Sequence, residues 1–346
     1  MKRPGFTLHQ GDHDELVVVV DQELRDTLGD ALGTRGFIAG DENTHITYCR
    51  DLLDRVLNER DKEVLWRVMR SPDNQGIVVF ENLPFEAVEW SPVPGAPAHS
   101  AKASSLSEHL LLAISSYAGD AYGVHKEGSR LVNDLIPSQS DMQRLTGNGS
   151  KVELGLHYEN AALRFARAGF NLSPLKLLLT GVSKQPFNGP ETMVASSSLA
   201  CQMISDASYQ VLRSPCVKIA LPVRQRTNSE SDWIGPAPVI LGSAGNEEIV
   251  GAFYGDMLVP LNDDAKVALG ELKNALEEVA FGVRIEPGRM VCISNGRALH
   301  GRSAFEPLFD DLGRAKRWIQ RVFVTERLDA FADFKIKSER VFDVNL

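Results

Sequence analysis

From about residue 150 onward the chain is a succession of short apolar runs, and this pattern restricts the possible folds more than any other feature. Most of the runs are bounded by Gly, Pro, Asn or Asp, the residues of turns, so each run is predicted to be a β-strand. Many short strands of this kind predict a double-sheet jelly roll, also called a double-stranded β-helix. The runs cover residues 175–180, 217–221, 238–241, 249–254, 290–294 and 318–324.

The first 120 residues have a different pattern of apolar residues and are predicted to form a mainly helical elaboration of that core. Apolar side chains at helical spacing predict helices over residues 43–58 and 104–119. Ser105 and Glu108 have the spacing of a capping box at the start of the second helix. Apolar runs at 16–20 and 75–82 predict two buried strands. The predicted fold class is therefore mainly β with helical elaboration, around a jelly-roll core.

We find no shift in composition that would mark a linker, so residues 1–346 are predicted to form a single domain with its jelly roll at 121–330. Helices are predicted to interrupt the strands at about 196–213 and 263–281. Residues 223–237 are polar, charged and contain Gly and Pro. A long irregular segment inside a compact domain is often a functional loop, so this segment is predicted to be a lid.

Composition excludes several classes of function. The formal net charge of −9 disfavours a broad surface for nucleic acid, because an acidic protein repels phosphates. No stretch approaches the roughly 20 apolar residues of a membrane span, so no membrane association is predicted. The four cysteines form no C-x-x-C pair, which fits a cytoplasmic protein with reduced thiols. The sequence does not indicate an oligomeric state.

Three residues have the pattern of a metal site. His157 and Glu159 follow a predicted strand, in which residues two apart point to the same side. His300 follows a second strand much later in the chain. Two histidines and one carboxylate make a facial triad, which leaves coordination positions open and is typical of non-haem iron(II) oxygenases. His157, Glu159 and His300 are therefore the predicted metal ligands.

Two arginines add a second signal. Arg317 and Arg321 lie in or beside a predicted strand, four residues apart, and so are expected to share one face. Guanidinium groups bind carboxylates in a fixed two-pronged geometry. The pair would suit a site that holds two carboxylates from two different small molecules. Arg314 competes with Arg317 for the first of these roles.

With these residues in place, the chain resembles the clavaminate synthase-like branch of the iron(II)/2-oxoglutarate-dependent oxygenases. That branch includes arginine, lysine and asparagine hydroxylases, which act on free amino acids and often serve the biosynthesis of specialised metabolites. The resemblance covers about residues 125–325. Its anchors are the stretches 128–137, 156–160, 287–288, 299–302 and 317–321, together with Asn295.

The resemblance implies a role for each predicted site residue. His157, Glu159 and His300 would bind Fe(II). Arg317, helped by the hydroxyl of Thr192, would bind the distal carboxylate of 2-oxoglutarate. The remaining two roles concern the substrate: Arg321 would bind its carboxylate, and Asp256 would contact its side chain.

The implied reaction is an O2-dependent hydroxylation of an unactivated carbon of a free L-amino acid, with 2-oxoglutarate as co-substrate. An acidic Asp256 favours a cationic side chain such as that of Lys or Arg. The carboxylate at Glu159 argues against the related halogenases, which carry a small residue at this position. Two alternatives stay open: the same chemistry on a carrier-tethered or peptidyl amino acid, and a non-catalytic, metal-binding jelly-roll protein.

Overall fold

The computed structural model describes residues 5–34, 36, 41–70, 75–143, 149–184, 189–222, 226 and 229–344. Its centre is a pair of facing β-sheets. The ten-stranded main sheet has the order β1-β2-β3-β15-β7-β17-β4-β19-β18, with β5 also paired to β17. The four-stranded small sheet has the order β14-β8-β16-β6. The predicted jelly-roll core, mainly β with helical elaboration, is confirmed.

The elements of the main sheet come from the whole length of the chain. They are β1 (Phe6–Gln10), β2 (Leu16–Val20), β3 (Ile77–Glu81), β4 (Asp120–Val124), β5 (Val132–Leu135), β7 (Lys176–Ser183), β15 (Met290–Ser294), β17 (Trp318–Thr325), β18 (Lys335–Ser338) and β19 (Val341–Asp343).

The small sheet contains β6 (Leu154–His157), β8 (Thr192–Ser196), β14 (Phe281–Val283) and β16 (Ala298–Arg302). Two further pairings lie outside both sheets. One joins β9 (Val217–Ala220), β10 (Trp233–Ala237) and β13 (Leu258–Pro260), and the other joins β11 (Ile240–Leu241) and β12 (Glu248–Ile249).

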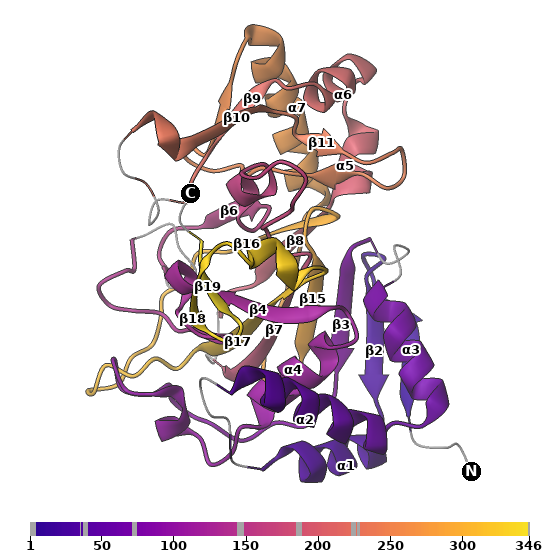
Figure 1. Ribbon diagram of the computed structural model, residues 1–346, viewed down its shortest axis with the longest axis vertical. Helices are drawn as coiled ribbons and strands as arrows, with labels where there is room; N and C mark the ends of the chain where they lie inside the picture. The colour runs from indigo at the N-terminus through magenta and orange to yellow at the C-terminus, as the bar shows by residue number, and fades with distance from the viewer. Residues whose placement is uncertain are drawn as a thin grey trace.

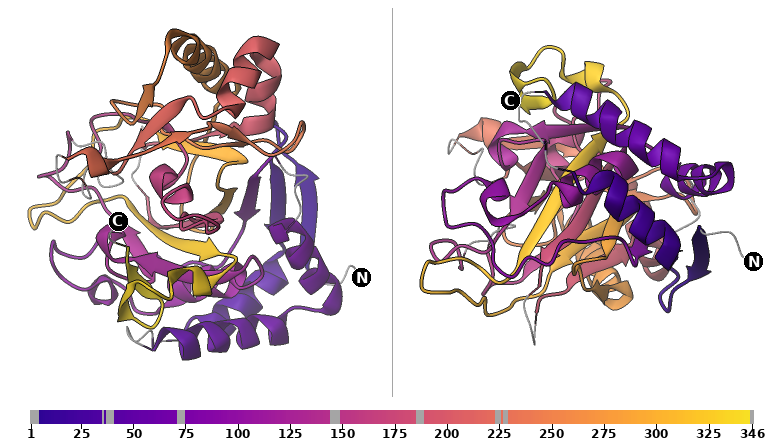
Figure 2. Two further views of the ribbon diagram at one scale, coloured as in Figure 1. Left: turned by 45° about the horizontal axis from the view of Figure 1, so that its top comes forward. Right: turned by 90° about the horizontal axis from the view of Figure 1, so that it is seen from below.

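Helices cover the outer face of each sheet (Figure 1). On the main sheet these are α1 (Gln22–Leu32), α2 (Glu42–Val56) and α4 (Leu106–Ser115), while α3 (Glu59–Arg70) lies alongside. Seen from below, these N-terminal helices cross the strands of the main sheet (Figure 2). On the small sheet they are α5 (Ser197–Met203), α6 (Asp206–Arg213) and α7 (Asp263–Val279). Within the described part of the chain, none of the helices could cross a membrane.

Side-chain alternation along the strands divides the interior into layers. Leu178 and Val322 pack into the cluster beneath the N-terminal helices, whereas Leu179 and Phe323 pack into the cluster between the two sheets. On the small sheet Val194 packs between the sheets, while its neighbour Ala195 packs under α5–α7. Every second residue of these strands therefore points into the space between the sheets, which we call the inter-sheet face.

The structure corrects several expected elements. The N-terminal region contains an unpredicted strand, β1, which pairs with β2, besides its four helices. The helix expected over 196–213 is two helices, because Ser205 caps a second one by accepting a hydrogen bond from the backbone of Ser208. In the predicted lid, residues 223–225 and 227–228 lie outside the described residues. Part of the rest is not irregular, since β10 pairs with β9.

The predicted capping box of Ser105 and Glu108 is wrong. Ser105 makes no side-chain cap, and the Glu108 carboxylate pairs with Lys102 instead. Glu108 also accepts a 2.9 Å hydrogen bond from Nε2 of Gln320, which lies on the helix side of β17. A buried carboxylate needs such partners, and α4 lies against β17, so tertiary contact replaced the local cap.

Candidate metal centre

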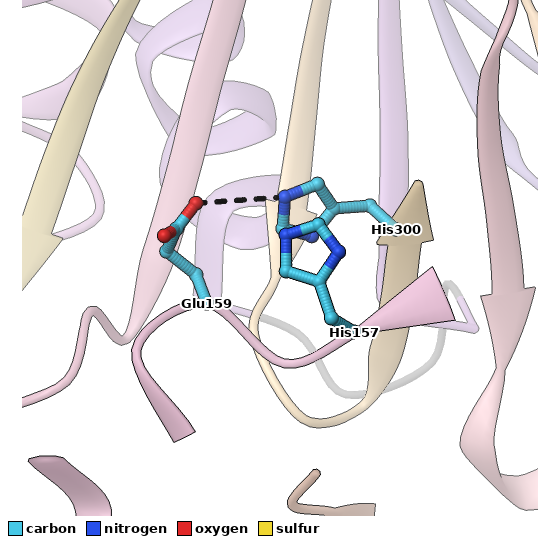
Figure 3. Close-up of side chains that lie close together, drawn as sticks. All are labelled: His157, Glu159 and His300. Atoms are coloured by element: carbon cyan, nitrogen blue, oxygen red, sulfur yellow. Dashed lines mark ion pairs between the residues drawn. The ribbon is translucent and has the colours of Figure 1, made fainter. Parts of the chain in front are cut away.

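His157, Glu159 and His300 converge at one point near the end of the small sheet (Figure 3). Each can offer one ligand atom, and these atoms lie within 4.8 Å of one another. All three residues are buried. His157 and His300 are directly opposite each other in the antiparallel pair of β6 and β16. The register of two strands thus brings together histidines that are far apart in the sequence.

Glu159 reaches the cluster in a different way from the one predicted. Strand β6 ends at His157, and Asn160 adopts a left-handed backbone with φ of 57°. The carboxylate is therefore placed by a turn and not by strand alternation. Asn295 holds that turn: its Oδ1 accepts from the backbone N–H of Glu159 at 2.9 Å, and its Nδ2 donates to the Glu159 carbonyl at 3.2 Å.

The donor set fits a divalent transition metal. Nδ1 of His157 lies 2.9 Å from the carbonyl oxygen of Gly155, which fixes Nδ1 as the donor and leaves Nε2 free to bind a metal. Nδ1 of His300 is buried without a partner among the described residues. Burial and the nearby His300 lower the pKa of His157 to about 4, so its imidazole is neutral, as a ligand must be.

The carboxylate is held in its charged form. Burial alone would raise the pKa of Glu159, but the charge of Arg321 and the hydrogen bond to His300 outweigh it and lower the pKa to about 2. Nη1 of Arg321 lies 2.9 Å from Glu159 Oε2. Two imidazoles and one anionic oxygen give the facial triad expected for non-haem iron, with positions left for other ligands.

Both predicted arginines lie on the inter-sheet side of β17. Arg321 alternates with Ile319 and Phe323, which pack between the sheets, and Arg317 immediately precedes the strand in the same alternation. Both are buried. Burial, together with the charge of Arg302, lowers the pKa of Arg317 to about 9. No carboxylate among the described residues forms an ion pair with Arg317.

Thr192 lies on the same inter-sheet side of β8. It is directly opposite Arg302 in β16 and two residues from Val194, which is opposite His300. Its side chain therefore points to the same side as the His300 imidazole. Thr192 and His300 share this layer with the arginines of the facing sheet, which is the placement that co-substrate binding would need.

Glu127 was not predicted, and the structure adds it to the site. It lies in the short 3-10 helix His125–Glu127, is buried, and its Oε2 is 3.6 Å from Nη2 of Arg321. Arg321 is thus placed between two carboxylates, those of Glu127 and Glu159. The sequence offered only one hint of Glu127, its position directly before the stretch 128–137 that anchors the resemblance. No rule of spacing along the chain connected Glu127 with Arg321.

Asp256 is apart from the cluster. Its side chain is 66% exposed and forms two hydrogen bonds with Arg226, at 2.9 and 3.1 Å. Those hydrogen bonds lower the pKa of Asp256. The connection to the metal centre is indirect: Tyr254, two residues earlier, has its ring edge-on to His157 with centroids 5.6 Å apart. The predicted contact of Asp256 with the substrate stays a prediction.

Arg314, the competitor of Arg317, lies elsewhere. Its Nε is 2.6 Å from Oδ2 of Asp310, and its guanidinium stacks near Trp90 at 5.9 Å. Its charge is therefore compensated within its own loop. Of the two arginines, only Arg317 combines burial with a charge that no carboxylate of the described residues balances.

Comparison with known proteins supports the class that the fold and the triad define, a non-haem iron oxygenase with a jelly-roll core. The chain is 27% identical over 259 residues to an L-asparagine oxygenase of Streptomyces coelicolor, covering 74% of this chain and 72% of the relative. It is 27% identical over 286 residues to an L-lysine 3-hydroxylase of Catenulispora acidiphila, covering 79% and 72%. Clavaminate synthase 2 of Streptomyces clavuligerus is 25% identical over 255 residues, covering 72% and 74%.

No family model matches the chain. The fold agrees with that of a solved asparagine oxygenase, crystallised with Fe(II), 3-hydroxyasparagine and succinate, with a TM-score of 0.80 at 22% identity over 95% of this chain and 99% of the other. The L-asparagine oxygenase, the L-lysine 3-hydroxylase and clavaminate synthase 2 are homologues of this chain, and the resemblance predicted from its motifs is confirmed.

Proposed function

We propose that this chain, as a single catalytic domain, hydroxylates an unactivated carbon of a free L-amino acid with Fe(II), 2-oxoglutarate and O2. The observation that carries the proposal is the buried cluster of His157, Glu159 and His300 between the two sheets. When bound there, iron(II) and 2-oxoglutarate supply the oxidising chemistry. The residues of this chain bind and orient the small molecules and keep water away from them.

The polar groups divide into two sets, one for each organic molecule. Arg317 and Thr192 both lie on the inter-sheet face, and we assign to them the distal carboxylate of 2-oxoglutarate, which would balance the charge of Arg317. Arg321 and Glu127 form a buried pair of opposite charges beside Glu159. A zwitterionic amino acid presents a carboxylate and an ammonium group, so it can pair with both members. A metal-binding protein without turnover would not need these two sets.

The free carboxylate also distinguishes the proposal from its nearest alternative. A carrier-tethered or peptidyl amino acid has no free carboxylate to pair with Arg321. Arg321 pairs with Glu127 and Glu159, so a free amino acid fits this group of charges better than a tethered one, because it brings a carboxylate for Arg321 together with an ammonium group for an acidic partner. We further propose a cytoplasmic location, because all four cysteines are free thiols.

The test is a coupled assay with purified protein, Fe(II), 2-oxoglutarate, O2 and each proteinogenic amino acid in turn. We expect one amino acid to gain one oxygen atom with stoichiometric succinate, as measured by mass spectrometry. The methyl ester of the same amino acid should be a poor substrate, because it lacks the carboxylate. Turnover of the ester or of a carrier thioester, but not of the free acid, would replace the proposal with the tethered alternative.

Whether Asp256 can bind a cationic substrate side chain depends on Arg226, which already forms an ion pair with Asp256. A cationic side chain would have to displace Arg226 before it could pair with Asp256. We therefore expect Arg226→Ala to raise kcat/KM for lysine- or arginine-like substrates by up to about fivefold over neutral ones, the range of an exposed ion pair. Arg226→Lys, which keeps the charge, serves as the control. An unchanged preference in Arg226→Ala would remove Asp256 from the substrate site.

A further inference from the structure

Arg302 is a buried cation to which neither the motif nor the proposed chemistry assigns a role. It lies two residues after His300 in β16 and points to the same inter-sheet side. Its guanidinium donates to three backbone carbonyls: Nη1 to Ser150 at 3.1 Å and Ser303 at 2.9 Å, and Nη2 to Val152 at 2.9 Å. Its Nε has no partner among the described residues.

Carbonyl oxygens fix the position of this group but do not cancel its charge. The Glu153 carboxylate offsets that charge only in part, since burial lowers the pKa of Arg302 to about 10 although Glu153 raises it. Among the residues that the structure describes, no carboxylate forms an ion pair with either Arg302 or Arg317. The two positive charges are close enough that Arg302 contributes to lowering the pKa of Arg317. Like charges in a low-dielectric interior are unfavourable unless an anion joins them, so this arrangement indicates an anionic ligand.

Phe305 connects the two arginines. Its ring centroid is 5.5 Å from the guanidinium carbon of Arg302 and 5.4 Å from that of Arg317. Phe305 is itself buried, and its backbone N–H donates to the carbonyl of Ser150, the same carbonyl that accepts from Arg302. The aromatic face attracts both cations and offsets part of their repulsion. Arg317 thus rests on a ring whose position is set by Arg302 and Ser150.

We propose that Arg302, acting with Phe305, is a positioning residue that makes the Arg317 pocket selective for a 2-oxo acid with a distal carboxylate. The second positive charge strengthens the attraction for that carboxylate, and the shared ring keeps the Arg317 guanidinium in place. Thr192, opposite Arg302 in the sheet, completes the pocket with a hydroxyl. This inference rests on the proposed function, because it concerns the co-substrate of the same site.

Calorimetric titration of the anaerobic Fe(II)-loaded protein tests the inference without turnover. The probes are 2-oxoglutarate and 2-oxopentanoate, which has the same chain length but no distal carboxylate. In Arg302→Gln we expect the Kd of 2-oxoglutarate to rise roughly tenfold, because one of two charges is lost. The Kd of 2-oxopentanoate should stay unchanged. Arg302→Lys, which keeps the charge, should bind 2-oxoglutarate within about threefold of the wild type.

Other outcomes would overturn the inference. One is an Arg302→Gln protein that binds 2-oxoglutarate as tightly as the wild type does. The other is a parallel rise in the Kd of both 2-oxo acids, which would mean that Arg302 only supports the fold. If Arg302→Gln does not fold, Phe305→Leu serves as the test instead. It should raise the Kd of 2-oxoglutarate severalfold and leave the Kd of 2-oxopentanoate unchanged. Arg314→Gln, whose arginine is paired with Asp310, is the matched control and should change neither Kd. A wild-type protein that binds no 2-oxoglutarate would instead refute the proposed function itself.

Discussion

His157→Ala is expected to lose both metal binding and turnover, the largest effect of any single substitution in this chain. His157 supplies one of three ligand atoms in the cluster, and its free Nε2 has no substitute among the neighbouring side chains of the described residues. Loss of groups that merely orient a ligand costs about 10–100-fold in affinity or activity, so loss of a ligand should cost more than roughly 100-fold. Bound iron per chain and succinate formation measure the two effects.

The control for this experiment is His99→Ala. His99 is exposed and lies outside the cluster, so this variant should bind metal and turn over like the wild type. The thermal midpoint of both variants checks that the fold is retained. Full iron occupancy in His157→Ala would contradict the assignment of the triad.

Arg317→Met is expected to weaken 2-oxoglutarate binding by about 100-fold or more, the second largest effect. Truncating one partner of a buried charge pair costs about 2–5 kcal/mol, and each 1.4 kcal/mol is a factor of ten in Kd. Methionine fills the volume next to Phe305 without a charge, and removing a buried, unbalanced cation should not destabilise the protein. Titration with 2-oxoglutarate under anaerobic conditions measures the change.

Arg314→Met is the matched control, because sequence alone left Arg314 and Arg317 as competitors for the same role. Arg314 is partly exposed and paired with Asp310 in its own loop. We expect its replacement to change the Kd of 2-oxoglutarate by less than about threefold, the range of a surface ion pair. If Arg314→Met strongly weakened the binding of 2-oxoglutarate and Arg317→Met hardly changed it, Arg314 would take the role assigned to Arg317.

Local patterns were sufficient for the fold class and for most of the site. The period of two along a strand is a property of the backbone, so it predicted correctly that Arg317 and Arg321 share one side of β17. The short apolar runs likewise predicted β7, β15 and β17 of the main sheet, but none of these runs falls on a strand of the small sheet. The triad could be found because its residue types are rare together and because metal chemistry restricts which side chains can serve.

The predictions from local pattern were wrong where a residue far away in the sequence contacts the side chain or backbone concerned. Glu159 was expected to point to the same side as His157 by strand alternation, but the chain turns at Asn160 and is held there by Asn295 from a distant segment. Glu108 has the spacing of a helix cap, yet the buried Lys102 and Gln320 bind it instead. In both cases a buried polar group takes the partner that satisfies it best, wherever that partner lies in the sequence.

The sequence by itself determined the double-sheet fold, the three residues of the candidate metal centre and the face that the two arginines share, because each follows from backbone periodicity or from the chemistry of a rare residue set. The tertiary structure alone decided how the charges are balanced. It paired Asp256 with Arg226 and Arg321 with Glu127. It also placed Arg302 and Arg317 together on Phe305, with no carboxylate of the described residues in an ion pair with either arginine. Electrostatic pairing depends on distance through space, which no spacing along the chain can supply.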